Sequence, residues 1–189
     1  MTAHPFIIVD KATFYRFVED APEGQRHEVV RGRIVQDMTG ASLSHAKITL
    51  RIAMILSRQL DIDKMSVSVS DRGVETPQTI RFPDVVVETS GAPPKSRSTL
   101  SPIIIVEALS ETSSERDLEA KPAEYTHLPS LMAYVVASQD EPACQVWLRG
   151  GNGTFDGQPL TIEGRDQMIH IPALKVAIPL AEVYRGIGS

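Results

Sequence analysis

Two carboxylates stand at the ends of apolar runs, where predicted strands would bury them. Asp84 follows Pro83 and opens the run at residues 85–87, and Glu107 follows the run at residues 102–106. An unpaired carboxylate buried there would cost several kcal/mol, so something must compensate each charge. If the two strands are neighbours, the carboxylates converge, and a proton or a hard cation must neutralise them. Oxygen ligands of this kind suit Mg²⁺ or Mn²⁺, so the pattern predicts a metal site.

Each carboxylate also has an interpretation that needs no metal. Glu107 could form a structural ion pair with an arginine or a lysine. Asp84 could serve turn chemistry at the entrance of a strand, because a proline followed by an aspartate is common in turns. Both interpretations stay open from the residues alone.

Hydrophobic periodicity indicates the elements that must position these carboxylates. Apolar residues recur at helical spacing over residues 44–60, with Ser42 or Ser44 available as the N-cap. β-branched residues on both sides of Arg31 and Gly32 are typical of a hairpin whose turn needs a positive φ. We also expect helices near 11–19, 115–126 and 178–185, strands within 66–75, 80–88, 102–110, 134–138, 144–149, 160–162 and 168–171, and a mobile polar loop at 91–101. This order predicts an α/β (α+β) fold with a central mixed β-sheet flanked by helices.

The composition limits the class of protein. The chain has 189 residues, 42% of them apolar and 23% charged, so we expect a single domain over residues 1–189. A formal charge of -5 excludes a protein that coats polyanions without specificity. Cys144 is the only cysteine, which excludes an intramolecular disulfide and favours a reducing compartment. No signal peptide or membrane span fits the sequence, so we expect a cytoplasmic protein that does not bind membranes.

The charge is segregated along the chain. Residues 26–58 contain six basic and two acidic residues, a local balance of +4. Residues 105–125 contain two basic and six acidic residues, a balance of -4. A negative net charge is therefore compatible with a polyanion that binds to one basic face of the protein.

Several basic residues could contact such a polyanion. Lys47, Arg51 and Arg58 share one face of the helix predicted at 44–60, where they could follow a nucleic-acid backbone or form a solvated face. His45, at the start of that helix, could contact a phosphate or serve as a cap or surface residue. Arg81 could contact a phosphate or pair with an acid.

Three segments together carry a resemblance to a known family. They are RFPDVVVE, PIIIVEALSETSSERDLEAKPAEY and LMAYVVAS, preceded by HEVVRGRIVQDM and SLSHAKI. In this order they resemble the Uma-type putative restriction endonuclease family, within the PD-(D/E)XK nuclease superfamily. The resemblance covers residues 28–184, and its most specific part is the succession PD, VE-x-LS and D-x-x-x-K-x-x-x-Y.

The resemblance implies a restriction-endonuclease-like core and metal-dependent cleavage of phosphodiester bonds in nucleic acid, with DNA as the expected substrate. Asp84 and Glu107 match the metal-binding acidic pair, and Glu28 matches an acidic residue that the superfamily often adds. Leu109 occupies the position of the superfamily's usual lysine, two residues after the second acid. Lys121 is the position that matches the family's lysine.

Phosphodiester hydrolysis needs charge neutralisation, an activated water and a stabilised leaving oxygen. Lys121 would orient the water or offset charge, or it would form a salt bridge to Glu124, Asp117 or Glu107. Tyr125 would bond a phosphate oxygen or pack between helix and sheet. Because Pro122 disfavours helical geometry at Lys121, we expect the helix either to start near Lys121 or to bend there.

Two functions follow from these residues. The first is a Mg²⁺-dependent endonuclease, with Mn²⁺ as an alternative ion, whose catalytic residues are Asp84, Glu107, Lys121 and Glu28. It would act as a homodimer if two sites cut opposite strands. The second is a catalytically impaired nuclease-fold module that binds nucleic acid or a protein partner, and it is motivated by Leu109 and Pro122.

Overall fold

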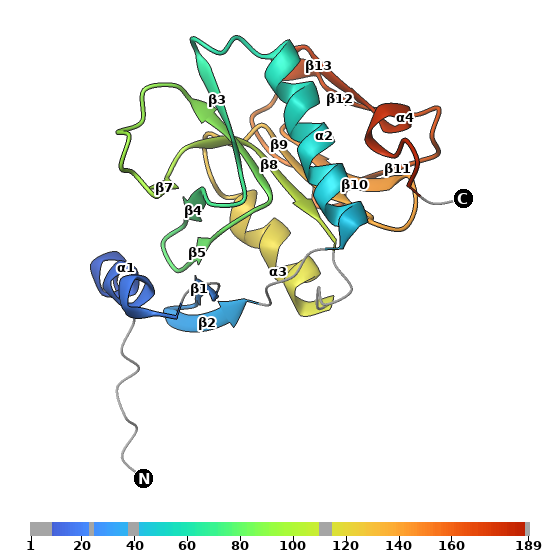
Figure 1. The fold of residues 1–189 in the computed structure, drawn as a ribbon. Coiled ribbons are helices and arrows are strands. Elements are labelled where there is room, and N and C mark those ends of the chain that lie inside the picture. Colours follow the sequence, from blue (N-terminus) through green and yellow to red (C-terminus); the bar gives the residue numbers. More distant parts are fainter. Residues whose placement is uncertain (1–8, 23–24, 38–41, 110–114, 188–189) are drawn as a thin grey trace.

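A six-stranded mixed sheet forms the centre of the molecule in a computed structural model (Figure 1). The structure describes residues 9–22, 25–37, 42–109 and 115–187, with only the backbone of 115–119. Strands β8 and β9 run parallel, and the other neighbours run antiparallel. The spatial order is β11 (Leu160–Glu163), β10 (Ala143–Leu148), β9 (Ala133–Ala137), β8 (Pro102–Ala108), β6 (Val85–Thr89) and β3 (Met65–Val69). This architecture confirms the predicted α/β (α+β) class.

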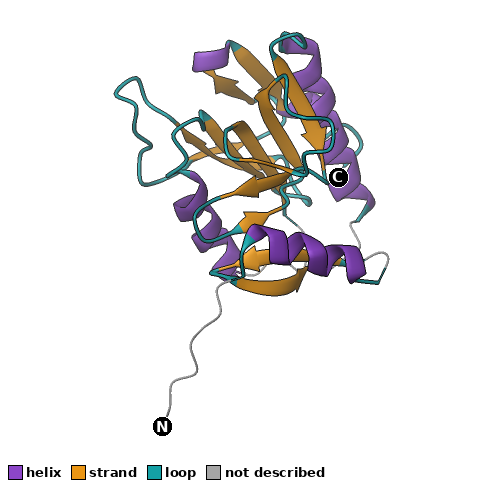
Figure 2. Cartoon of the chain, turned by 90° about the vertical axis from the view of Figure 1, so that its left-hand side faces the viewer, coloured by secondary structure: helices purple, strands orange, loops and turns teal. Residues whose placement is uncertain are grey.

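Helices cover both faces of this sheet because its central strands are apolar on both sides. In β6, Val85 and Val87 pack in one core cluster with α2 (Leu43–Gln59), whereas Val86 packs in a second cluster. The second cluster contains Tyr125 of α3 (Glu115–Tyr125). Figure 2 shows the strands between the helices. The two helices therefore reach the sheet from opposite faces.

The N-terminal part of the chain builds a smaller sheet beside α1 (Lys11–Asp20) (Figure 1). The predicted hairpin is confirmed, with its turn at Arg31 (φ 51°) and Gly32 (φ 74°). The positive φ at both turn positions matches the twist of the flanking strands, as in type I′ hairpins. The order of this sheet is β2 (Arg33–Asp37), β1 (Arg26–Val30), β5 (Ile80–Arg81), β4 (Gly73–Glu75) and β7 (Ser98–Thr99).

The C-terminal segment packs against α2. It forms a two-stranded sheet of β12 (Met168–Ile171) and β13 (Val176–Pro179), joined by a 3₁₀ turn η1 (Pro172–Leu174), and ends in α4 (Leu180–Val183). Buried residues of β12, β13 and α4 belong to the same core cluster as α2. None of the helices that the structure describes is long and apolar enough to cross a membrane.

Two local expectations were wrong. The loop at 91–101 contains the short strand β7, which pairs with β4. The terminal helix is only four residues long, because residues 176–179 form β13. In both cases tertiary contacts decide the conformation over local propensity. The predicted helix at 115–126 is confirmed as α3, and because Pro122 lies inside it, the alternative of a start near Lys121 is excluded.

Ser42, and not Ser44, caps α2, and this gives a test of the fold. The Ser42 hydroxyl accepts from the amide of His45 at 3.1 Å and donates to Gln139 at 2.7 Å. Ser42→Ala should lower the free energy of unfolding by about 1 kcal/mol, because the amide loses its acceptor. Ser44→Ala is the matched control and should change it by less than about 0.5 kcal/mol. Urea unfolding measures the free energy of unfolding of both variants, and an equal decrease in the two would contradict the assignment of Ser42 as the cap.

Candidate active site

Asp84 and Glu107 lie side by side because β6 and β8 are antiparallel neighbours. Val85 pairs with Val106, so one step further along the register Asp84 stands opposite Glu107. The amide of Ala108 donates to Asp84 Oδ2 at 2.8 Å, which fixes this carboxylate against β8. The adjacency on which the metal-site hypothesis depends is therefore present.

Glu107 is a buried carboxylate held by one cation. Lys121 Nζ lies 2.9 Å from each of its oxygens, and Tyr125 donates to Oε1 at 3.4 Å. Burial raises the pKa of Glu107 to about 7, Lys121 opposes this rise, and the charges of Asp84 and Glu28 add to it. The buried environment thus favours the protonated form of Glu107 over the charged form up to about pH 7.

Lys121 reaches Glu107 from α3, not from β8. Burial alone would lower the pKa of Lys121, but the charges of Glu107 and Glu28 raise it, so the side chain is an ammonium. Leu109, at the usual lysine position, packs against the cluster that contains Tyr125 and Tyr134. A lysine there would point into an apolar core, which gives a physical reason why the amine comes from the helix.

His45 faces Asp84 from the first turn of α2. Its Nε2 lies 3.2 Å from Asp84 Oδ2, and only 14% of its side chain is exposed. The hydrogen bond to Asp84 raises the pKa of His45, although burial opposes the rise. Ser42 occupies the capping position, so the capping alternative for His45 is wrong.

Glu28 and Arg81 form an ion-pair group beside Glu107. Arg81 donates to Glu28 Oε2 at 3.0 Å, and the amide of Phe82 donates to Oε1 at 3.0 Å. The other side of the guanidinium binds both oxygens of Glu124 on α3, at 3.0 and 3.1 Å. Arg81 was predicted either to contact a phosphate or to pair with an acid. Only 2% of it is exposed, and the structure shows that it pairs with acids.

Comparison with known proteins places the chain in a family. The family model Uma2, described as "Putative restriction endonuclease", matches residues 12–181. The chain belongs to this family. "Uncharacterized protein slr1290" of Synechocystis sp. is 25% identical over 166 residues, which covers 86% of this chain and 85% of that protein.

A solved structure is similar in fold. It is described as a putative nuclease belonging to DUF820 from Anabaena variabilis, with a TM-score of 0.73 and 12% identity. The match covers 89% of this chain and 95% of that one. This likeness confirms the restriction-endonuclease-like fold, and the Uma2 description supports a nuclease.

The remaining predicted residues of this Uma2 chain divide between the site and the C-terminal segment. Tyr125 is buried, meets Tyr134 edge-to-face at 5.1 Å between ring centroids, and also reaches Glu107. Arg51 donates to the carbonyl of Val183 at 2.9 Å. Arg58 pairs with Glu182 at 2.7 Å. Two of the three cations in the predicted stripe therefore hold the C-terminal segment.

Lys47 and Asp117 complete the set of predicted residues. Lys47 is partly exposed in the second turn of α2, two residues after His45. Asp117 belongs to α3, but its side chain lies outside the described residues. Glu124, which sequence reasoning named only as an alternative partner of Lys121, binds Arg81 instead. The sequence did contain a signal that Glu124 lies near the site: it is three residues after Lys121, which places the two side chains on adjacent turns of one helix.

The donor atoms present fit a hard divalent cation. Asp84 and Glu107 offer carboxylate oxygens, and burial beside Asp84 makes the charge of Glu107 costly unless a cation approaches. Among the described residues, no set of three or more His, Cys, Asp or Glu side chains has metal-binding geometry. Mg²⁺ typically uses one or two carboxylates and completes its shell with water and substrate phosphate, so two carboxylates suffice.

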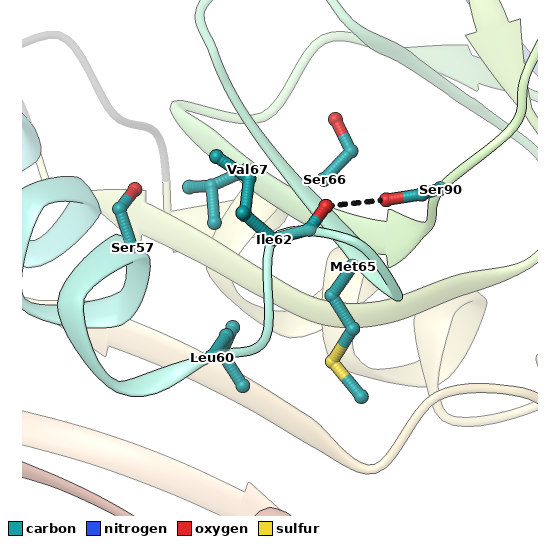
Figure 3. Close-up of a pocket in the computed structure, with 7 residues that line it drawn as sticks. All are labelled: Ser57, Leu60, Ile62, Met65, Ser66, Val67 and Ser90. Atoms are coloured by element: carbon teal, nitrogen blue, oxygen red, sulfur yellow. Dashed lines mark hydrogen bonds between the residues drawn. The ribbon is translucent and has the colours of Figure 1, made fainter.

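A separate pocket carries none of this chemistry (Figure 3). It lies between the end of α2 and β3, where Ser90 donates to the carbonyl of Ile62 at 3.1 Å. Its lining is Ser57, Leu60, Ile62, Met65, Ser66, Val67 and Ser90. No side chain that lines this pocket is a carboxylate, an amine or an imidazole. We therefore assign the candidate active site to the carboxylates on neighbouring strands and not to this pocket.

The raised pKa of Glu107 predicts how stability depends on pH in metal-free buffer. Between its ordinary value of 4.5 and about 7, the folded protein binds this proton more strongly than the unfolded chain does. The free energy of unfolding should therefore fall as pH rises through this window, by up to about 1.4 kcal/mol per pH unit. Glu107→Gln should flatten this dependence, whereas the exposed control Glu163→Gln should retain it. Urea unfolding in EDTA measures it, and identical slopes in all three proteins would refute the assignment.

Proposed function

We propose that this Uma2 protein is a Mg²⁺-dependent endonuclease that hydrolyses phosphodiester bonds in DNA, with Mn²⁺ as an alternative ion. The observation that carries the proposal is the register of β6 and β8, which puts Asp84 opposite Glu107, with Lys121 against Glu107. A cation site and an ammonium group next to a reacting phosphate can supply the charge neutralisation that phosphodiester hydrolysis needs. The family description supports the endonuclease class.

Asp84 and Glu107 would hold the ion. When bound, a divalent cation neutralises charge on the phosphate oxygens and lowers the pKa of a water molecule. The chain's own contribution is to keep both carboxylates fixed, since the Ala108 amide holds Asp84 and Lys121 and Tyr125 hold Glu107. Such fixed ligands need no reorganisation before the reaction.

Lys121 would have two tasks in turn. In the structure its ammonium group bridges both oxygens of Glu107 and so offsets the buried charge. With nucleic acid present, the same group would orient the attacking water or offset charge on the phosphate. It extends from α3, which packs on the face of the sheet opposite to the one that α2 covers.

His45 and the N-terminal region would receive the nucleic acid. The raised pKa of His45 favours an imidazolium beside Asp84 at the start of α2, where it can bind a phosphate oxygen. Lys47, partly exposed two residues after His45, would attract the backbone, whereas Arg51 and Arg58 hold the C-terminal segment. A symmetric homodimer would let two sites cut opposite strands of a duplex.

A plasmid-nicking assay tests the proposal. The wild-type protein should nick supercoiled DNA with Mg²⁺ or Mn²⁺ and not with EDTA. Asp84→Asn and Glu107→Gln should each reduce the rate about 100-fold or more, as expected for the loss of charge stabilisation at the reacting phosphate. Asp63→Asn, an exposed acid elsewhere, serves as the matched control and should retain the wild-type rate.

The same assay separates the second function. If the wild-type protein binds the plasmid but does not nick it, or if all variants nick equally, the enzyme proposal is wrong. Binding without cleavage would instead indicate the nuclease-fold binding module that Leu109 and Pro122 suggest.

A further inference from the structure

The helix that carries Lys121 is attached to the molecule largely through side chains. In its fully described part, α3 packs on the sheet through Tyr125 of the second core cluster, and Lys121 and Glu124 bind polar partners outside the helix. Pro122 has no amide hydrogen, so the helix also lacks one of its own backbone hydrogen bonds next to Lys121. The position of the Lys121 ammonium group therefore depends on the side chains that tie α3 down.

Besides the contacts at Glu107, one fork of hydrogen bonds ties α3 to the N-terminal sheet. Arg81 in β5 donates through Nε and Nη2 to the two oxygens of Glu124, at 3.1 and 3.0 Å. Its Nη1 donates to Glu28 in β1 at 3.0 Å. Glu28 is itself fixed by the amide of Phe82 at 3.0 Å. A buried guanidinium thus joins one helix to two strands.

We propose that Arg81 is a positioning residue, which holds α3 through Glu124 and thereby fixes Lys121 against Glu107. The inference rests on the proposed function, because it assigns Lys121 a task in hydrolysis. Glu124 lies three residues after Lys121, so a contact that fixes one fixes the adjacent turn. A bidentate arginine–carboxylate pair fixes direction as well as distance, which a single contact does not.

Arginine is required for this geometry. A lysine would keep a positive charge between Glu28 and Glu124. Its ammonium group, however, is not a planar fork, so it cannot bind both oxygens of Glu124 and also one oxygen of Glu28. Arg81→Lys should therefore loosen α3 while a cation remains between the buried Glu28 and the partly buried Glu124.

The chain supplies a matched control in Arg72. This arginine is also buried and binds both oxygens of Glu88, at 2.6 and 3.0 Å, but its partners lie away from α3. Arg72→Lys therefore removes the same kind of pair and carries a similar cost in stability. Glu124→Gln serves as a second variant, because it weakens the same pair of hydrogen bonds by changing the residue on α3.

Hydrogen exchange tests the hold on α3 without any need for activity. In Arg81→Lys and Glu124→Gln, the amides of residues 123–128 should exchange about 10-fold faster than in the wild-type protein, because local opening becomes easier. In Arg72→Lys they should exchange at the wild-type rate. Equal exchange of these amides in Arg81→Lys and Arg72→Lys would overturn the proposal.

Kinetics test the link to Lys121. Arg81→Lys should lower kcat about 100-fold with little change in KM, since a displacement of about 1 Å at a reacting group has this effect. Arg72→Lys should keep kcat. The double variant Arg81→Lys with Lys121→Gln should cleave no more slowly than Lys121→Gln alone, because Arg81 would act through Lys121. If the two substitutions instead lower kcat by factors that multiply, the proposal is overturned. If the wild-type protein does not cleave DNA at all, the proposed function is overturned, and the hydrogen-exchange experiment still tests whether Arg81 holds α3.

Discussion

Two neighbouring buried carboxylates repel each other, and much of the structure around them serves to offset that repulsion. The antiparallel register of β6 and β8 forces Asp84 and Glu107 together. Lys121 approaches from α3 and His45 from α2, and Arg81 pairs with two further acids, Glu28 and Glu124. These cations do not remove the cost entirely, since the pKa of Glu107 remains raised to about 7. The divalent cation that we propose would offset the remaining charge.

This constraint also explains why separate parts of the chain meet at one end of the sheet. The helix α2 packs on one face and α3 on the other, while the N-terminal sheet supplies Glu28 and Arg81 at the edge of the site. The apolar strand cores set the layers, and the charged residues determine where the layers touch. Family membership and fold agree with a nuclease built on this arrangement.

Much of this could be predicted from the sequence, because local patterns carry it. The apolar runs before Glu107 and after Asp84 indicated strands, and the family resemblance implied Lys121 in place of Leu109. The partners of Arg81 and of Arg51 could not be predicted, since they depend on how distant elements pack: Glu124 is 43 residues from Arg81, and Val183 is 132 residues from Arg51. The single-domain organisation, the homodimer and the cytoplasmic location stay predictions.

The central claim is that Asp84 and Glu107 form one cation site, and a metal titration tests it most directly. Metal-free protein is titrated with Mn²⁺ while free Mn²⁺ is followed by electron paramagnetic resonance. One ion should bind to the wild-type protein, and the affinity for Mn²⁺ should be at least about 10-fold lower in Asp84→Asn and in Glu107→Gln, because each variant loses a charged ligand. Equal Mn²⁺ affinity in all three proteins would contradict it.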